Sequence, residues 1–180
     1  APAQYALGIM YSQGIGVKED LKKVFELYSS AVQQQYAPAQ CELGVMYAQG
    51  HGVPQDWKEA FKLYSAAAQQ GYTPAQNNLG TLYYRGIGVE KDLKEAFKWF
   101  FLAAKQDYPN AQYNLGRMYL DGMGVPQNDQ EAFKWFSLAA KQNDREGQYN
   151  LGIMYQNGTG VPQNDQEAFK PVSYTHLTLP

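Results

Sequence analysis

A unit of 36 residues returns along this chain without insertion or deletion, and that period is the strongest constraint on its fold. Periods of roughly 20 to 50 residues are typical of solenoids, in which each copy packs on its neighbours. The repeat array takes up residues 1–170, and its members are complete copies at 3–38, 39–74, 75–110 and 111–146 and a partial copy at 147–170. The array therefore leaves no room for a second domain before residue 171.

The first helix of each copy is predicted by an apolar side and carries a glycine in its interior. In the third copy, Ala75, Leu79 and Leu82 lie on one side of an ideal helix, which we expect to run from about Ala75 to Arg85. Gly80 lies beside this side, and a glycine recurs at its position in every copy. An interior Gly costs about 1 kcal/mol relative to Ala, so we expect it to allow the close approach of a neighbouring backbone.

A Gly-x-Gly-Val turn separates the two helices of each copy. Gly86 follows the last periodic residue of the third copy and can take the left-handed conformation that ends a helix, and Gly88 lets the chain reverse. A nucleotide-binding loop would need a third glycine, a Lys-Ser/Thr pair and a preceding strand. The sequence lacks these features, so the turn is interpreted as structural.

The second helix begins at a capping signal and continues as an apolar stripe. Asp92 and Glu95 match a capping box, in which the Asp accepts from first-turn amides and the Glu reaches back; paired catalytic carboxylates are the alternative. The stripe that follows has helical period and consists of Ala96, Phe97, Phe100, Ala103 and Ala104. We therefore predict an all-α protein, a right-handed α/α solenoid of 36-residue helix-turn-helix repeats.

The repeated run Ala-Gln-x-x-Leu-Gly-x-x-Tyr-x-x-Gly-x-Gly-Val, followed by Asp and Ala-Phe-x-Trp-Phe-x-x-Ala-Ala, resembles the Sel-1-like repeat family, which is related to the tetratricopeptide repeats. The resemblance covers residues 1–170 and implies a non-enzymatic adaptor or scaffold that binds a protein or peptide partner. A cysteine-rich bacterial branch of the family ties each repeat with a disulfide, whereas this chain has one cysteine. An envelope-associated enzyme, or a binder of peptidoglycan or β-lactam-type ligands, is the alternative that this branch implies.

Charge and composition disfavour several kinds of partner and chemistry. Fifteen Lys and Arg against seventeen Asp and Glu leave a net charge of -2, so we expect no nucleic-acid partner. No apolar run approaches the roughly 20 residues that cross a bilayer, so no membrane is expected in this segment. Cys41 and His51 are the only thiol and imidazole in the repeats, and we expect an inert surface thiol and a solvated turn His. We therefore expect no catalytic residue, metal site or cofactor.

The side of the first helix opposite its core differs from copy to copy. We expect these positions to be free of the core and, if the first helices line the inside of the superhelix as in the resembling families, to form a concave binding row. Asn78, Asn114 and Asn150 recur at the border of this side, where each amide could pair with a peptide unit of an extended ligand or with an adjacent loop. Drift on a solvated face is the alternative for the whole row. The candidate partner-binding residues are Tyr5, Ile9, Asn77, Asn78, Thr81, Tyr84, Tyr113, Asn114, Arg117, Leu120, Tyr149, Asn150 and Ile153.

The two ends and the last complete junction depart from the pattern. The junction Asn143-Asp144-Arg145-Glu146-Gly147 has lost the Tyr, the Pro and the opening Ala of the others, and we expect the softest interface there. Pro171 would lie inside a helix at a cost of about 3 kcal/mol, and residues 172–180 resemble a translated sequencing adapter, so 171–180 is predicted to be a non-native tail. The chain begins inside a repeat without Met, and we expect both ends to be truncations of a longer chain.

Overall fold

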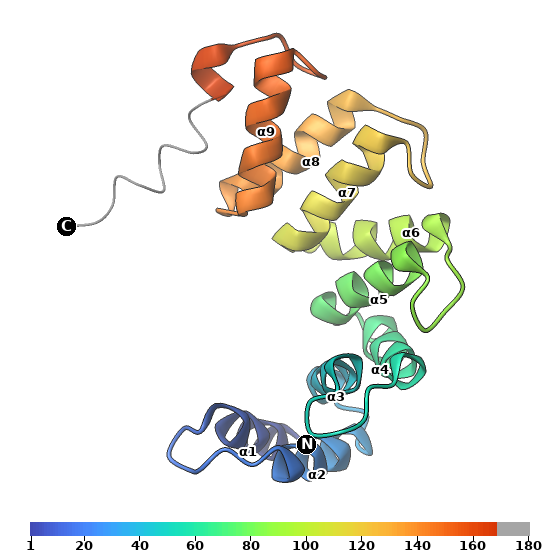
Figure 1. The fold of residues 1–180 in the computed structure, drawn as a ribbon, viewed down its shortest axis with the longest axis vertical. Coiled ribbons are helices and arrows are strands. Elements are labelled where there is room, and N and C mark those ends of the chain that lie inside the picture. The colour runs from blue at the N-terminus through green and yellow to red at the C-terminus, as the bar shows by residue number, and fades with distance from the viewer. Residues whose placement is uncertain (169–180) are drawn as a thin grey trace, which may run out of the picture. The chain divides into compact units, whose positions relative to one another are not determined.

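The computed structural model describes residues 1–168 and shows helices and no strand in that range (Figure 1). The chain divides into two compact units, Ala1–Lys91 and a second that begins at Asp92. The first unit contains α1 (Pro2–Gln13), α2 (Leu21–Val32), α3 (Ala37–Gln49), α4 (Trp57–Gln69) and α5 (Thr73–Arg85). The second contains α6 (Leu93–Ala104), α7 (Pro109–Asp121), α8 (Asp129–Lys141), α9 (Arg145–Asn157) and a further helical turn at 165–168. The predicted all-α solenoid of helix-turn-helix repeats is confirmed, and the predicted tail at 171–180 lies outside the described residues.

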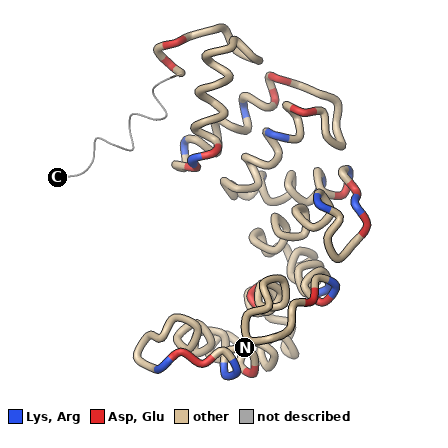
Figure 2. The backbone as a smooth tube through the Cα atoms, viewed as in Figure 1, with Lys and Arg blue, Asp and Glu red and all other residues tan. Residues whose placement is uncertain are grey.

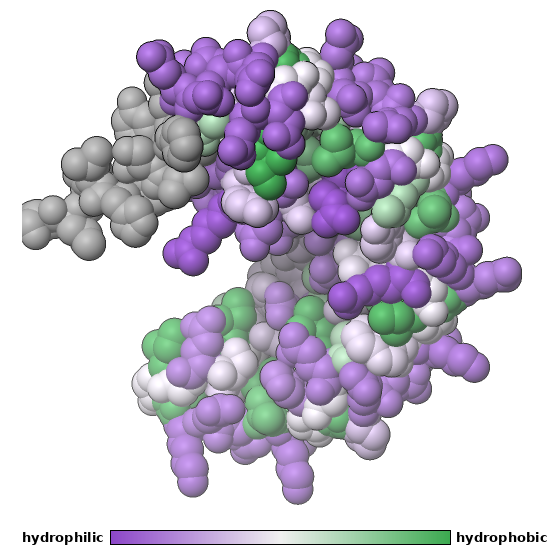
Figure 3. All heavy atoms as spheres, turned by 45° about the horizontal axis from the view of Figure 1, so that its top comes forward, coloured by the Kyte–Doolittle hydropathy of each residue, from purple (hydrophilic) through white to green (hydrophobic). Residues whose placement is uncertain are grey.

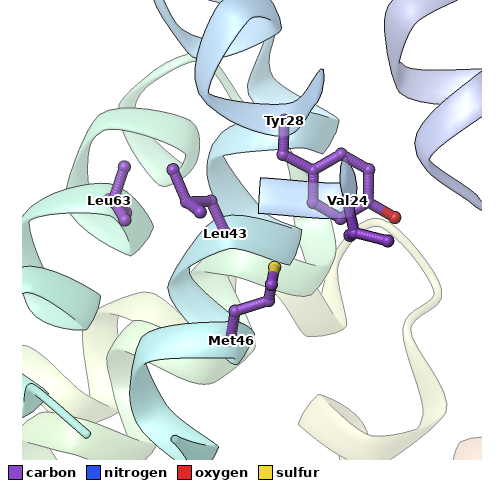
Figure 4. Close-up of a cluster of buried hydrophobic side chains, with 5 residues drawn as sticks. All are labelled: Val24, Tyr28, Leu43, Met46 and Leu63. Atoms are coloured by element: carbon purple, nitrogen blue, oxygen red, sulfur yellow. The ribbon is translucent and has the colours of Figure 1, made fainter. Parts of the chain in front are cut away.

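In the first unit, each helix packs against the helices that precede and follow it in the chain. Figure 4 shows the side chains that meet between α2, α3 and α4, each at most 8% exposed: Val24, Tyr28, Leu43, Met46 and Leu63. Because α3 contributes to this cluster between two second helices, it is held from both sides. The first helix of a repeat therefore joins its own repeat to the previous one.

The second unit has the same construction. One cluster joins α6, α7 and α8 and consists of Ala103, Ala104, Ala111, Leu115 and Trp135. A second cluster joins α8 and α9 and contains Ala132, Phe136 and Met154. The core continues from one repeat to the next, as expected for a solenoid whose repeats bury one another's faces. The predicted stripe of the second helix is confirmed here, because Ala96, Phe100, Ala103 and Ala104 are all buried.

The interior glycines of three first helices, Gly8, Gly44 and Gly116, make room for an aromatic ring. A Cβ on Gly116 would lie 2.8 Å from both Cδ1 and Cε1 of Phe136, in the second helix of the same repeat. Gly44 faces Tyr64 in the same way, with 2.7 Å to Cε1. The prediction that these glycines admit a neighbouring backbone is wrong at both positions, because the close neighbour is a side chain. The ring replaces the methyl group that an Ala would place there. The prediction is confirmed at Gly152, where a Cβ would lie 2.7 Å from the carbonyl oxygen of Ala168.

A close approach of two backbones also occurs at the second glycine of the turn. Gly124 has a φ of +73°, and a Cβ on it would run into the carbonyl oxygen of Leu93, at the start of the preceding second helix. Gly88 meets the carbonyl of Trp57 in the same way. A side chain at these sites would meet both a left-handed backbone and a clash. The first glycine of the turn therefore ends a helix, and the second allows the turn to pack against the backbone of the previous repeat.

Side-chain caps begin the second helices. Asp56 accepts hydrogen bonds from the backbone N–H groups of Lys58 and Glu59 at 2.9 and 3.0 Å, as predicted. The reciprocal half of the capping box is wrong, because the N–H of Asp56 donates to the carbonyl of Tyr47 at 2.9 Å and not to Glu59. Glu59 instead pairs with Lys62 at 2.7 Å. The same cap is made at Asp20, Asp92, Asn128 and Asn164.

A column of buried glutamines joins consecutive helices, although sequence reasoning gave it no role. Gln112, which is 0% exposed, donates from Nε2 to the carbonyl of Ala104 at 3.3 Å. Its Oε1 accepts from Nε2 of Gln142 at 2.9 Å. In the first unit, Gln40 accepts from Gln70 in the same way at 2.7 Å. One amide group thus links three successive helices by hydrogen bonds. The free-energy cost of burying this amide is offset because both its donor and its acceptor are hydrogen-bonded.

The surface separates charge from the first helices. In the first unit most charged residues lie on α2, α4 and the turns around them (Figure 2), whereas α1, α3 and α5 carry only Glu42 and Arg85. Hydrophilic side chains project all over the face seen in Figure 3, with apolar residues scattered between them. Among the described helices, none has the length and apolar character to cross a membrane. A binding site is therefore better sought in the hollows of this surface than in an apolar patch.

Candidate functional site

Two cavities in the first unit occupy equivalent places in consecutive repeats. The first, of about 440 Å³, lies where α1, α2 and α3 meet, and the second, of about 170 Å³, lies where α3, α4 and α5 meet. Eight pairs of lining residues are one period of 36 residues apart in the sequence: Ser12 and Ala48, Leu21 and Trp57, Tyr28 and Tyr64, Glu42 and Asn78, Val45 and Thr81, Met46 and Leu82, Gln49 and Arg85, and His51 and Ile87. The fold therefore repeats a hollow between successive first helices, and the residues at equivalent positions give each hollow its own chemistry.

The first cavity combines apolar walls with two carboxylates. Its walls come from the start of α2 and the middle of α3, where Val24, Tyr28 and Met46 are also members of the buried cluster of Figure 4. Ser12, whose hydroxyl donates to the carbonyl of Ile9 at 2.9 Å, and Tyr28 lie together in this lining. The remaining lining residues are Glu19, Leu21, Glu42, Val45, Gln49 and His51. The volume is in the range of ligand-binding pockets, roughly 300 to 1,000 Å³.

Glu42 is the electrostatic centre of the first cavity. Its side chain is half-buried and is hydrogen-bonded to no described residue, and burial raises the pKa of its carboxyl group above the ordinary value. The same negative charge adds to burial in raising the pKa of the Tyr28 hydroxyl and of the Cys41 thiol. A half-buried carboxylate without a cation beside it is destabilising, and a positively charged ligand group would relieve this.

The second cavity has a different polar lining. Asn78 takes the place of Glu42 and donates from Nδ2 toward Sγ of Cys41 at 3.8 Å, and Arg85 takes the place of Gln49. Trp57 and Tyr64 supply aromatic surface from α4. This cavity therefore offers an amide and a guanidinium group where the first offers carboxylates.

The structure places the candidate residues of the first unit in several environments. Asn78 and Thr81 line the second cavity, and the hydroxyl of Thr81 donates to the carbonyl of Asn77 at 3.0 Å. Asn77 itself is 8% exposed, so the expectation that its position is free of the core is wrong. Tyr5 packs on Tyr28 with ring centroids 5.6 Å apart, so it too contacts the core. Ile9 and Tyr84 are half-buried.

The candidate residues of the second unit are likewise spread along α7 and α9. Tyr113 packs on Phe136 at 5.9 Å between ring centroids, and Leu120 packs on the same cluster. Arg117 is exposed and pairs with Asp121 at 3.2 Å. Tyr149 is 64% exposed, and Nδ2 of Asn150 donates to the carbonyl of Glu146 in its own helix. Asn114 and Ile153 are half-buried. Partner binding by these residues remains a prediction.

Cys41 is a core residue and not a surface thiol. Only 2% of it is exposed, and burial together with the Glu42 charge raises the pKa of its thiol to about 12. The outward position expected for it is wrong because the next first helix, α5, lies against this side of α3, where Nδ2 of Asn78 donates toward Sγ of Cys41 at 3.8 Å. A thiol with so high a pKa is a poor nucleophile at neutral pH. His51 is exposed in the turn, where it lines the first cavity.

Sequence reasoning missed Glu42 as a site residue. A signal was present, because Glu42 holds in its copy the position that Asn78, Asn114 and Asn150 hold in later copies. A single charge in an otherwise uncharged helix is also visible in the sequence of α3. The carboxylates and imidazole of the first cavity do not gather tightly, because the described residues contain no group of three or more His, Cys, Asp or Glu that could hold a metal ion.

Comparisons with known proteins agree with this architecture. The Sel1 repeat pattern matches the chain five times, at residues 1–36, 37–72, 73–108, 109–144 and 145–170. Among solved structures, a protective antigen of uropathogenic Escherichia coli strains that displays an SLR fold is 37% identical, with a TM-score of 0.90 over 96% of this chain. This chain spans 37% of the length of that antigen.

Two further structures extend the comparison. A Sel1 repeat protein from Oxalobacter formigenes is 32% identical, with a TM-score of 0.87 over 94% of this chain and 70% of that one. The cysteine-rich protein B of Helicobacter pylori is 24% identical, with a TM-score of 0.54 over 69% of this chain and 94% of that one, and shares the fold. No protein with a curated function matches the sequence.

Proposed function

This chain belongs to the Sel1 repeat family, and from that premise we propose that it is a non-enzymatic scaffold or adaptor that binds a protein or peptide partner through the surface of its first helices. Solenoids of this family are generally scaffolds for protein interaction, without catalytic activity. The proposal places the contact on the first helices, which we predict to form the concave side of the array. The second helices carry the local caps and ion pairs and are assigned to the opposite side.

One observation carries this proposal: equivalent cavities recur between successive first helices of the first unit. The residues that differ between them, such as Glu42 and Asn78 or Val45 and Thr81, lie at the linings and not in the shared core. An extended peptide presents side chains at a regular spacing, and a row of cavities suits such a ligand. Variation at the lining of a constant scaffold is how repeat proteins acquire a specific partner.

The alternative is an envelope-associated enzyme, or a binder of peptidoglycan or β-lactam-type ligands. The described residues offer little support for it. The thiol of Cys41 is buried with a raised pKa, and Glu42 is hydrogen-bonded to no described side chain that could serve as its partner in acid-base catalysis. The adaptor is therefore the better-supported function.

Site-specific photo-crosslinking with a library of short peptides tests the proposal. Benzoylphenylalanine at Val45 or Thr81, which line the two cavities, is expected to give more peptide adduct than the same group at Lys58 or Lys62 on α4. Circular dichroism of each variant controls for folding. Equal labelling of both sets would contradict the proposal, and thermal stabilisation by muropeptides or a β-lactam but by no peptide would favour the alternative.

A further inference from the structure

We propose that the cavity between the first two repeats receives the side chain of a Lys or Arg residue of the protein partner, with the Glu42 carboxylate as its counter-ion. The cavity is the one bounded by Ser12, Tyr28, Val45 and His51, and the inference rests on the proposed function in taking that partner to be a protein or peptide.

The charge of the lining selects a cation. Glu19 and Glu42 contribute two carboxylates, and the lining contains no Lys or Arg. In the neighbouring second helices, Lys23 pairs with Glu26 at 2.9 Å and Lys62 pairs with Glu59 at 2.7 Å. Glu42 has no such match and is half-buried. A ligand cation would therefore add a counter-ion where the folded chain supplies none.

The shape and walls select a long basic side chain and not a metal ion. Leu21, Val24, Val45 and Met46 form apolar walls that suit the methylene stem of Lys or Arg. The Tyr28 ring also lines the cavity, and an aromatic ring can attract the charged head of such a side chain. A bare cation would leave the apolar walls uncovered, and the acidic groups do not cluster into a metal-ligating set in the described residues.

The neighbouring cavity shows that this chemistry belongs to one repeat. Asn78 stands where Glu42 would be, and Arg85 stands where Gln49 would be, so the second cavity presents a positive group. The preference for a basic side chain is therefore a local element of specificity on a repetitive scaffold. A peptide that spans both cavities would be fixed in one register by this difference of charge.

Binding of peptide pools to the full chain tests the inference. Acetylated and amidated peptide pools carry Arg, Lys, norleucine or Glu at a fixed central position, with the flanking positions randomised, and binding is measured by fluorescence polarisation. The wild-type chain is expected to bind the Arg and Lys pools at least about tenfold more tightly than the Glu pool. Glu42→Gln is expected to reduce this preference to within about twofold.

Matched variants keep the test specific. Glu90→Gln makes the same change of charge on an exposed loop of the first unit and is expected to keep the preference. The melting temperature of Glu42→Gln is expected to be no lower than that of the wild type, which excludes unfolding as the cause of lost binding. Val45→Lys, which places an ammonium group on the cavity wall, is expected to lose the preference as well.

Three results would overturn the inference, and they differ in what they say about the proposed function. Pools that bind without regard to the central charge would refute the basic side chain while leaving a peptide-binding scaffold. A preference that survives Glu42→Gln would place the basic side chain elsewhere on the chain. Failure of every pool to bind would refute the scaffold proposal together with the inference.

Discussion

The first and second helices of this solenoid are stabilised in different ways. The second helices α2, α4, α6 and α8 each begin at a side-chain cap and contain an i,i+3 ion pair of their own. The first helices α1, α3, α5 and α7 begin without a side-chain cap. Their special residues, the interior glycines and the buried glutamines, contact the neighbouring second helices. A first helix therefore depends on its neighbours, whereas part of what stabilises a second helix is local.

This difference separates the residues that build the array from those that are free to vary. The contacts that hold a first helix use a few fixed positions, such as Gly116 and Gln112. Other positions of the same helix type line cavities, and these differ between copies, as Val45 and Thr81 do. Substitutions at these fixed positions are expected to reduce stability strongly, and substitutions in the caps and ion pairs of the second helices to reduce it weakly. Substitutions at the cavity linings are expected to change binding.

The largest effect is expected from Gly116→Leu. The new Cβ would lie 2.8 Å from the Phe136 ring, which is fully buried and cannot move aside without opening the core. We expect a loss of about 3 kcal/mol or more in the free energy of unfolding, measured by urea denaturation.

Gly116→Ala and a double variant provide the controls. Helix propensity alone would make Gly116→Ala about 1 kcal/mol more stable, whereas the ring contact predicts a loss. Adding Phe136→Leu removes part of the ring and is expected to recover part of the loss. Stability equal to or above the wild type for Gly116→Ala would show that the ring does not fill this space.

A smaller loss is expected from Gln112→Leu, which tests the glutamine column. The change removes the bond to the Ala104 carbonyl and leaves the amide of Gln142 without its acceptor. We expect a loss of about 1–3 kcal/mol by thermal or urea unfolding, because buried polar groups are left unpaired. Gln130→Leu, at an exposed position of α8, is the matched control and is expected to stay within about 0.5 kcal/mol of the wild type. Equal effects of the two changes would mean that the column does not join the helices.

The cap and the ion pair of a second helix are expected to contribute less to the free energy of unfolding. Asn128 accepts from the N–H groups of Gln130 and Glu131 at 3.1 Å, so Asn128→Ala is expected to lose about 1 kcal/mol. Glu131→Gln removes only the exposed pair with Lys134 and is expected to lose roughly 0.2–0.5 kcal/mol. Thermal melts of both variants check the order. A cap variant as damaging as Gln112→Leu would remove the distinction between the two kinds of helix.

The sequence was sufficient for the architecture because helical period, turn glycines and caps are local signals that recur with the repeat. It was insufficient where a contact is made between elements. The ring that fills the space at Gly116 and the carbonyls that meet the turn glycines come from residues 20 or more positions away, and no local pattern indicates them. The prediction that Cys41 is exposed was wrong for the same reason, since Asn78 of the next first helix lies against its thiol.

The last complete junction shows the same limit. Loss of the Tyr and Pro before α9 suggested the softest interface, which remains a prediction. Asp144 begins α9 with a side-chain cap, accepting from the N–H of Gly147 at 2.7 Å, whereas α1, α3, α5 and α7 have none. A Cβ on Gly147 would lie 2.8 Å from Cβ of Ala139, so the missing Ala side chain there permits tighter packing on α8. The departures from the repeat pattern at this junction thus come with a helix cap that the other junctions lack and with a closer packing of α9 on α8.

The smallest effect, and the one with opposite sign, is expected from Glu42→Gln, which separates the cavity lining from the structural positions. Burial raises the pKa of the Glu42 carboxyl in the folded state, so the folded chain binds the proton more tightly than the unfolded chain does. Wild-type stability therefore falls as pH rises from the ordinary Glu pKa through the raised one, and the loss is complete above it. Other titratable groups around Glu42 are Tyr5, Glu19, Tyr28, Cys41, His51 and Tyr64. At neutral pH we expect Glu42→Gln to be more stable than the wild type, because the variant has no buried negative charge. The gain is expected to be roughly a few tenths of a kcal/mol, since water screens a half-buried carboxylate. Melting temperatures of both proteins between acidic and neutral pH measure this, and the difference should vanish once Glu42 is protonated in both states. If the variant were less stable than the wild type at neutral pH, the Glu42 carboxylate would stabilise the fold, which would contradict its role as a group that is paired only when a ligand binds.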